Sequence, residues 1–280
     1  MSATSGWSKA TAASGGDLLN VGGGEVRLGE GDTLTTMGTF GNIGAVNVLG
    51  ATVPGGDPTT LDFRGDGGNF GEMSAIGGRS VVYGALTNAA GAELLNGGAG
   101  ELILFDALTN DGELATGTGS TTIVAGDYSG AGSLTGGGSV LFEGDVSTGA
   151  SPALVDFTSD IDLTNAGTTT MELAGTMRGA AYDAWDVTGA LTLGGDLSVV
   201  NLDGFLADRG DSFTLFEASD GITGAFDTVD FAPLASGRWR EVRTATSYGF
   251  QVAPIPLPAG AWLLATGLGL LGTLAVRRRA

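Results

Sequence analysis

The amino-acid sequence predicts a mainly β protein: a glycine-rich parallel β-solenoid, or β-helix, followed by one C-terminal transmembrane helix. Three observations lead to this fold class. Short apolar-x-apolar segments recur along the chain, glycine supplies 52 of the 280 residues, and an uncharged run near the C-terminus ends in three arginines. Alternating apolar residues are typical of a strand with one buried face. Glycine provides the tight turns that join such strands.

Two columns of apolar residues mark the recurring strand, and they lie two residues apart in each copy. The first column reads Val26, Val46, Leu61, Val81, Ile103, Ile123, Val140, Val155, Met171 and Leu191. The second column reads Leu28, Val48, Phe63, Tyr83, Phe105, Ala125, Phe142, Phe157, Leu173 and Leu193. Copies follow one another every 15 to 22 residues with Gly, Asn and Asp between them, as in the coils of a parallel solenoid.

Stacking of these coils would place the aromatic members of the second column on one interior stripe. Those residues are Phe63, Tyr83, Phe105, Phe142 and Phe157. Two copies also share the tetrapeptide Ala-Leu-Thr-Asn, at 85–88 and at 107–110. An antiparallel sandwich with hairpins at similar spacing remains an alternative.

Charge and missing residue types exclude several functions. Residues 1–254 hold nine basic and all 31 acidic residues, a net charge of −22, and the whole chain has −19. Such a surface repels nucleic acid, so no nucleic-acid partner is expected. The chain contains neither histidine nor cysteine, which excludes Ser-His-Asp triads, His-ligated metals and disulfides.

Motifs for catalysis and cofactor binding are missing from the sequence. It has no lysine-bearing phosphate loop, His-Glu-x-x-His, EF-hand or nucleophile elbow. We therefore expect no catalytic residues, no cofactor and no metal site. The pairs Gly126-Asp127 and Gly144-Asp145 suggest Ca²⁺ between coils, but the calcium-binding nonapeptide is absent. The tripeptide Arg64-Gly65-Asp66 resembles an adhesion motif, and we attribute it to chance in a chain rich in Gly and Asp.

Composition divides the chain into four parts. Residues 1–24 are polar and lack an apolar signal-peptide core, so we expect a poorly ordered or truncated N-terminus. Residues 25–180 form the solenoid coils. Residues 181–253 are richer in aromatics and form the terminal coils and a β cap, because the open end of a solenoid has to be covered. Residues 254–280 form a C-terminal signal.

The C-terminal part combines three elements. Prolines at 254, 256 and 258 interrupt regular structure. Residues 259–276 contain no charge, and as a helix they would span about 27 Å, close to the hydrocarbon thickness of a bilayer. Small residues four apart give this helix one face for close helix packing. That face comprises Ala261, Ala265, Gly269 and Thr273, and the basic anchor that follows comprises Arg277, Arg278 and Arg279.

This tail resembles the PEP-CTERM class of sorting signals. The motif of the VPLPA variant is matched by Ile255, Pro256, Leu257, Pro258 and Ala259, with Ile in place of the leading Val. The resemblance implies an exosortase-like membrane enzyme that recognises the tail and cuts near the motif. The Arg cluster would then stay cytoplasmic and the rest of the chain would lie outside. Residues 182–226 are similar to the last passenger coils of autotransporter-like surface proteins, which implies a solenoid end.

These inferences together predict an exported cell-surface, envelope or matrix protein with a structural or adhesive function. Its expected partners are the exosortase-like sorting enzyme, the membrane and, as a further candidate, envelope polysaccharide. Two alternatives remain open. One is a carbohydrate-active surface enzyme that uses carboxylate pairs on a β-solenoid. The other is a passive coat protein without a specific ligand.

Overall fold

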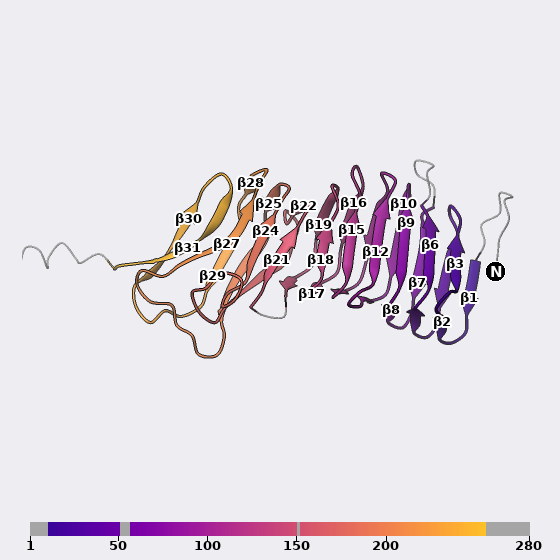
Figure 1. Ribbon diagram of the computed structural model, residues 1–280, viewed down its shortest axis with the longest axis horizontal. Coiled ribbons are helices and arrows are strands. Elements are labelled where there is room, and N and C mark those ends of the chain that lie inside the picture. The colour runs from indigo at the N-terminus through magenta and orange to yellow at the C-terminus, as the bar shows by residue number, and fades with distance from the viewer. Residues whose placement is uncertain (1–10, 51–56, 150–151, 256–280) are drawn as a thin grey trace, which may run out of the picture.

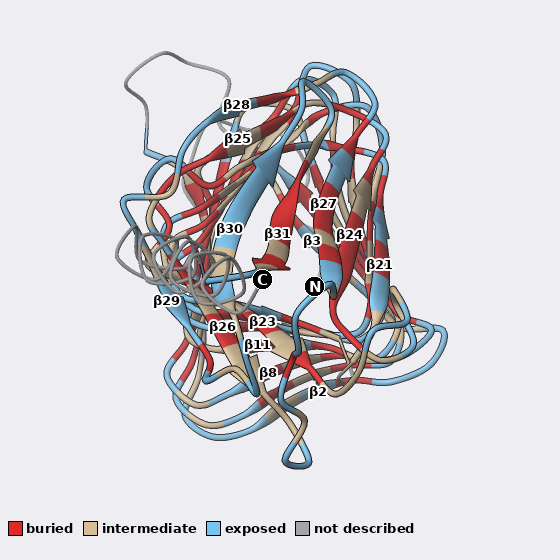
Figure 2. Cartoon of the chain, turned by 90° about the vertical axis from the view of Figure 1, so that its left-hand side faces the viewer, coloured by how far each residue is buried: buried red, intermediate tan, exposed pale blue. Residues whose placement is uncertain are grey.

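The chain winds into a rod of stacked coils, each made of three short strands (Figure 1). The structure is a computed structural model and describes residues 11–50, 57–149 and 152–255. Seen along the rod, three sheets enclose a common interior (Figure 2). Successive coils pair in parallel within each sheet, so the rod is a three-sided parallel β-solenoid.

Each sheet takes every third strand of the chain, and we name the sheets A, B and C. Sheet A consists of β1 (Thr11–Ser14), β4 (Thr33–Thr36), β7 (Thr59–Phe63), β10 (Arg79–Tyr83), β13 (Glu101–Leu104), β16 (Thr121–Val124), β19 (Ser139–Phe142), β22 (Asp160–Asp162), β25 (Leu191–Leu193) and β28 (Ile222–Gly224).

Sheet B consists of β2 (Leu18–Asn20), β5 (Phe40–Asn42), β8 (Gly67–Asn69), β11 (Leu86–Asn88), β14 (Leu108–Asn110), β17 (Tyr128–Gly130), β20 (Val146–Thr148), β23 (Thr168–Leu173), β26 (Asp196–Asn201) and β29 (Thr228–Phe231). Sheet C consists of β3 (Glu25–Leu28), β6 (Ala45–Leu49), β9 (Glu72–Ile76), β12 (Glu93–Gly97), β15 (Glu113–Thr116), β18 (Ser133–Thr135), β21 (Leu154–Phe157), β24 (Ala184–Val187), β27 (Ser212–Ala218), β31 (Ser247–Ala253) and β30 (Arg238–Arg243).

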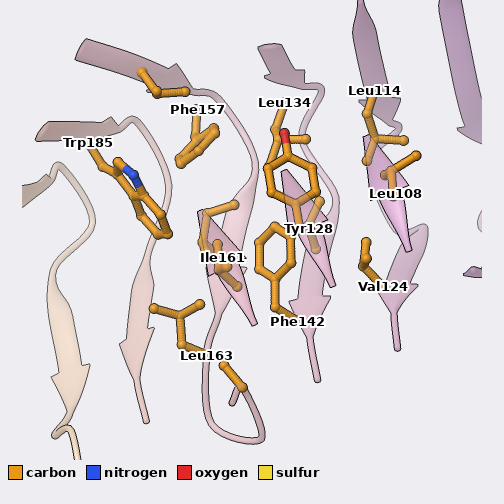
Figure 3. Close-up of a cluster of buried hydrophobic side chains, with 14 of the residues drawn as sticks. Leu108, Leu114, Val124, Tyr128, Leu134, Phe142, Phe157, Ile161, Leu163 and Trp185 are labelled. Carbon is orange, nitrogen blue, oxygen red and sulfur yellow. The ribbon is translucent and has the colours of Figure 1, made fainter. Parts of the chain in front are cut away.

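Apolar side chains of all three sheets fill the interior (Figure 3). Alternation along each strand turns every second side chain inward. In sheet A, in-register pairing joins inward residues of successive coils into a stripe. That stripe runs through Leu61, Val82, Leu104, Val124 and Phe142, each no more than 2% exposed. Burial of this continuous stripe is the main source of stability that the coils share.

A ladder of buried asparagines runs along the end of sheet B. The side-chain amide of each donates to the side-chain oxygen of the next, at 2.8 Å in four successive steps. The members are Asn20, Asn42, Asn69, Asn88 and Asn110. The same amides also donate to backbone carbonyls of sheet C, for example Asn88 Nδ2 to Glu113 O at 3.0 Å. These bonds satisfy polar groups inside the rod and fix the turn from sheet B to sheet C.

The ladder ends at Asn110, whose side-chain amide donates to a tyrosine instead of to another asparagine. Asn110 Nδ2 donates to the Tyr128 hydroxyl at 3.3 Å. Burial raises the pKa of Tyr128 to about 12, so the hydroxyl stays neutral. Beyond this coil the interior becomes aromatic, with Phe157, Trp185 and Phe216 in edge-to-face contacts at 5.1 Å between ring centroids.

Antiparallel strands close the C-terminal end of sheet C. Strand β31 pairs antiparallel with β27 and with β30, whereas every pair before them is parallel. The change of direction ends the repeat, because a further coil can no longer add to β27. Phe213 of β27 and Tyr248 and Phe250 of β31 are buried here, and Trp239 of β30 packs against Phe213 and Phe250. These antiparallel strands lie within residues 181–253, where the sequence predicted a β cap.

The structure corrects the predicted fold class. The three parallel sheets agree with a β-solenoid, but the described residues contain no helix, and therefore none long and apolar enough to cross a membrane. A solenoid with a transmembrane helix is thus wrong for the part of the chain that the structure describes. Short alternating segments broken by glycine leave no stretch there in which a helix can form. Residues 259–276, where that helix was expected, lie outside the described residues.

The predicted apolar columns also mixed strands of different sheets. Val46 belongs to sheet C, Leu61 to sheet A and Met171 to sheet B. Tyr83, the last residue of β10, and Phe105, directly after β13, are about two-fifths exposed and do not share the interior stripe of sheet A. A shift by one residue turns the buried side chains of a strand to the outside. The spacing of apolar residues in the sequence does not determine which of the two faces is buried.

Candidate functional site

An open groove of about 560 Å³ lies on the outer surface where sheet A turns toward sheet B. It spans the coils of β7 and β10 and reaches Asp106 in the coil of β13. Polar and aromatic side chains and backbone together form its walls. The side chains that matter for binding are Thr60, Asp62, Arg64, Asp66, Tyr83 and Asp106.

Local sequence explains why these residues face the groove. In β7, Thr60 and Asp62 alternate with the buried Leu61 and Phe63, so they point outward. The corner that follows brings Arg64 and Asp66 to the surface, and both are exposed. These two residues are the charged ends of the tripeptide that resembled an adhesion motif.

Glycine keeps the floor of the groove clear of side chains. Gly84 follows Tyr83 directly and has φ +91°, in the left-handed region that favours glycine. A Cβ at Gly84 would collide with the carbonyl oxygen of Phe63 in the neighbouring coil. The two coils therefore approach closely at this corner, and the larger side chains stand around it.

The charged groups of the groove are partly paired with the protein. The Arg64 guanidinium lies 2.7 Å from Asp62 Oδ2, and the Arg64 side chain is 62% exposed. Asp106 Oδ2 accepts a hydrogen bond from Gly84 N at 2.8 Å. A groove with one guanidinium and three carboxylates offers both donors and acceptors, with an excess of acceptors.

An exposed aromatic pair flanks the polar groups. Tyr83 is 41% exposed and Phe105 is 42% exposed. Their rings stack with centroids 4.8 Å apart and an interplanar angle of 16°. Because Tyr83 lines the groove, a ligand there meets an aromatic surface beside carboxylates and a guanidinium. Apolar surface with a few oriented polar groups is typical of a small-molecule or glycan site.

The Gly-Asp pairs considered for calcium have a structural role at the corners. Asp127 Oδ1 accepts from Asp145 N at 3.0 Å, and Asp145 Oδ1 accepts from Thr168 N at 2.7 Å. These carboxylates thus link successive coils through backbone hydrogen bonds. Among the described residues, no group of three or more acidic side chains is placed to hold a metal ion.

The predicted sorting residues fall at or beyond the end of the described chain. Ile255 is described and is 68% exposed. The remaining motif residues 256–259, the small-residue face at 261, 265, 269 and 273, and the arginines 277–279 lie outside the described residues. The sorting motif therefore stays a prediction from sequence.

Sequence reasoning did not identify the groove. The repeated Ala-Leu-Thr-Asn tetrapeptide aligns Leu86 with Leu108, and the structure pairs these residues. Counting back from this alignment also matches Tyr83 with Phe105. The repeated tetrapeptide therefore contained enough information to place Tyr83 opposite Phe105 in successive coils. It did not show that both side chains point outward. Comparison of the sequence with protein-family models gives no match, and comparison with curated proteins finds no relative.

Proposed function

We propose that this protein is an exported cell-surface or matrix component with a structural and adhesive function, and that its rod binds envelope polysaccharide at the groove beside Tyr83. The observation that supports binding is the exposed Tyr83–Phe105 stack next to Asp62, Arg64 and Asp106. A sugar ring presents C–H groups to an aromatic surface and hydroxyls to carboxylates and guanidinium. The groove offers these complementary partners in one place.

The architecture supports a structural role. Each coil contacts mainly its neighbours, so the chain forms an extended rod rather than a compact body (Figure 1). Strong negative charge keeps such rods apart in solution. Export rests on a different basis, the resemblance of residues 255–259 to a sorting motif, and includes the exosortase-like enzyme as a proposed partner.

Affinity electrophoresis in gels that contain extracted envelope polysaccharide tests the binding. Tyr83→Ala and Phe105→Ala should each weaken binding about two- to tenfold, because each removes part of the aromatic surface. Phe70→Ala is the matched control, since Phe70 is 59% exposed but lies outside the groove residues. Equal retardation of all three variants would count against the groove as the binding site.

The carboxylates of the same groove favour one second candidate, a carbohydrate-active enzyme. Asp62, Asp66 and Asp106 all line it, and glycoside hydrolysis uses a pair of carboxylic acids. Release of reducing ends from the bound polysaccharide distinguishes the two functions. A surface adhesin should release none, whereas an enzyme should release them and lose that activity in Asp66→Asn.

A further inference from the structure

Basic side chains are concentrated at the C-terminal end of this acidic protein. Residues 1–254 contain nine basic residues, and four of them fall between 209 and 243. They are Arg209, Arg238, Arg240 and Arg243. Strands β30 and β31 form that end of the rod (Figure 1), and β30 is almost wholly exposed (Figure 2).

Two of these arginines line a hollow of about 370 Å³. Its wall consists of Arg209, Gly210, Arg240 and the segment 251–254. The Arg240 guanidinium donates to Gln251 Oε1 at 2.8 Å, which orients it without neutralising its charge. None of the described residues that line this hollow is acidic.

Two carboxylates that neighbour Arg209 in sequence, Asp208 and Asp211, accept hydrogen bonds within the same loop. Asp208 Oδ1 accepts from the Ser236 hydroxyl and from Arg209 N, and these two bonds, together with the charge of Arg209, lower the pKa of Asp208. Asp211 Oδ2 accepts from Asp208 N at 2.8 Å. Elsewhere on the rod the exposed arginines pair with acids, as Arg27 does with Glu25 at 2.6 Å. Within the described residues, no such ion pair joins Arg209 or Arg240.

We propose that this basic hollow binds the phosphodiester headgroups of an anionic lipid surface. Guanidinium groups match phosphate oxygens in two-point hydrogen bonds. Arginines near an anionic bilayer are attracted to it, whereas the acidic sides of the rod are repelled. The rod would therefore meet the lipid with its capped end.

The position of the hollow agrees with this partner. Pro254 forms part of its wall, and the chain continues from there into the uncharged sequence 259–276 and the arginines 277–279. The end of the rod that bears the hollow is thus the end nearest in sequence to the most apolar segment of the chain. This inference is independent of the polysaccharide groove, which lies in the coils of β7, β10 and β13.

Co-sedimentation of the full chain with vesicles tests the proposal. Phosphatidylcholine vesicles are compared with vesicles that also contain phosphatidylglycerol, so that binding by the apolar tail is common to both. Arg209→Gln and Arg240→Gln should each reduce the extra affinity for the anionic vesicles about fivefold, and the double variant about 25-fold. The effect should shrink at high salt.

A double variant of equal charge change provides the control. Arg27→Gln with Arg79→Gln removes two exposed arginines far along the rod and should leave anionic binding near the wild-type value. Equal loss in both double variants, or no loss in the Arg209/Arg240 variant, would overturn the proposal. A binding measurement with glycerol phosphate distinguishes recognition of a lipid surface from recognition of a free phosphate group. Tight arginine-dependent binding of glycerol phosphate without vesicle binding would also overturn it.

Discussion

Substitution of one member of the asparagine ladder should destabilise the rod strongly. Asn88 is fully buried. Its amide donates to Asn110 Oδ1 at 2.8 Å and to Glu113 O at 3.0 Å, and its oxygen accepts from Asn69 Nδ2 at 2.8 Å. Asn88→Ala removes all three hydrogen bonds and leaves Asn110 Oδ1 inside the rod without that donor.

The magnitude follows from these contacts. A hydrogen bond contributes about 1 kcal/mol net, and a buried acceptor without its donor costs about 1–3 kcal/mol more. Three lost hydrogen bonds and one buried acceptor without a donor therefore predict that Asn88→Ala lowers the free energy of unfolding by about 4–6 kcal/mol. Asn47→Ala is the matched control, because Asn47 lies on the outer face of β6 and its side chain, among the described residues, bonds to the Glu25 and Ser74 side chains alone. That variant should lose less than about 1 kcal/mol.

Urea unfolding followed by circular dichroism measures both variants. Hydrogen exchange then locates the damage, which should concentrate in the coils next to Asn88, since each coil contacts only its neighbours. The reasoning fails if Asn88→Ala costs no more than Asn47→Ala. It also fails if amides of β25 and β28 lose protection as strongly as those of β11 and β14.

Three further predictions concern the core, a corner and pH. Phe142→Ala should cost about 3–5 kcal/mol because Phe142 is 1% exposed, whereas Phe105→Ala should cost less than about 1 kcal/mol; similar losses in thermal unfolding would contradict the assigned faces. Gly84→Ala should destabilise by more than about 1 kcal/mol, since a methyl group at φ +91° is strained and meets the next coil; an unchanged melting temperature would argue against that corner. Burial raises the pKa of Asp183 to about 6, against the backbone hydrogen bonds from Ala153 and Glu172 that favour its charged form. The folded state then binds this proton more tightly than the unfolded state does, so stability should decline as the pH rises from about 4 to about 6, by at most about 3 kcal/mol. Calorimetry across this range should show that slope in the wild type and a weaker one in Asp183→Asn, and equal slopes would exclude Asp183 as its source.

The sequence by itself determined the solenoid part of the fold class, whereas the transmembrane helix that it also predicted is absent from the described residues. Alternating apolar residues and frequent glycines between them predict stacked strands, and the three parallel sheets agree with that expectation. The repeated Ala-Leu-Thr-Asn also gave a true register, because Leu86 pairs with Leu108 and Asn88 with Asn110. Local pattern suffices for such features since the same short segment recurs with the same neighbours.

Tertiary structure alone decided which face each strand presents and which residues meet across coils. Tyr83 and Phe105 looked like core residues from their spacing, but the pairing of Val82 with Leu104 turns both rings outward. Which residues of a strand point inward depends on the length of the corner before it. One residue more or less in a corner turns every side chain of the following strand to the opposite face. The groove beside Tyr83 and the basic hollow beside Arg209 each join segments distant in sequence, so only the winding of the chain brings them together.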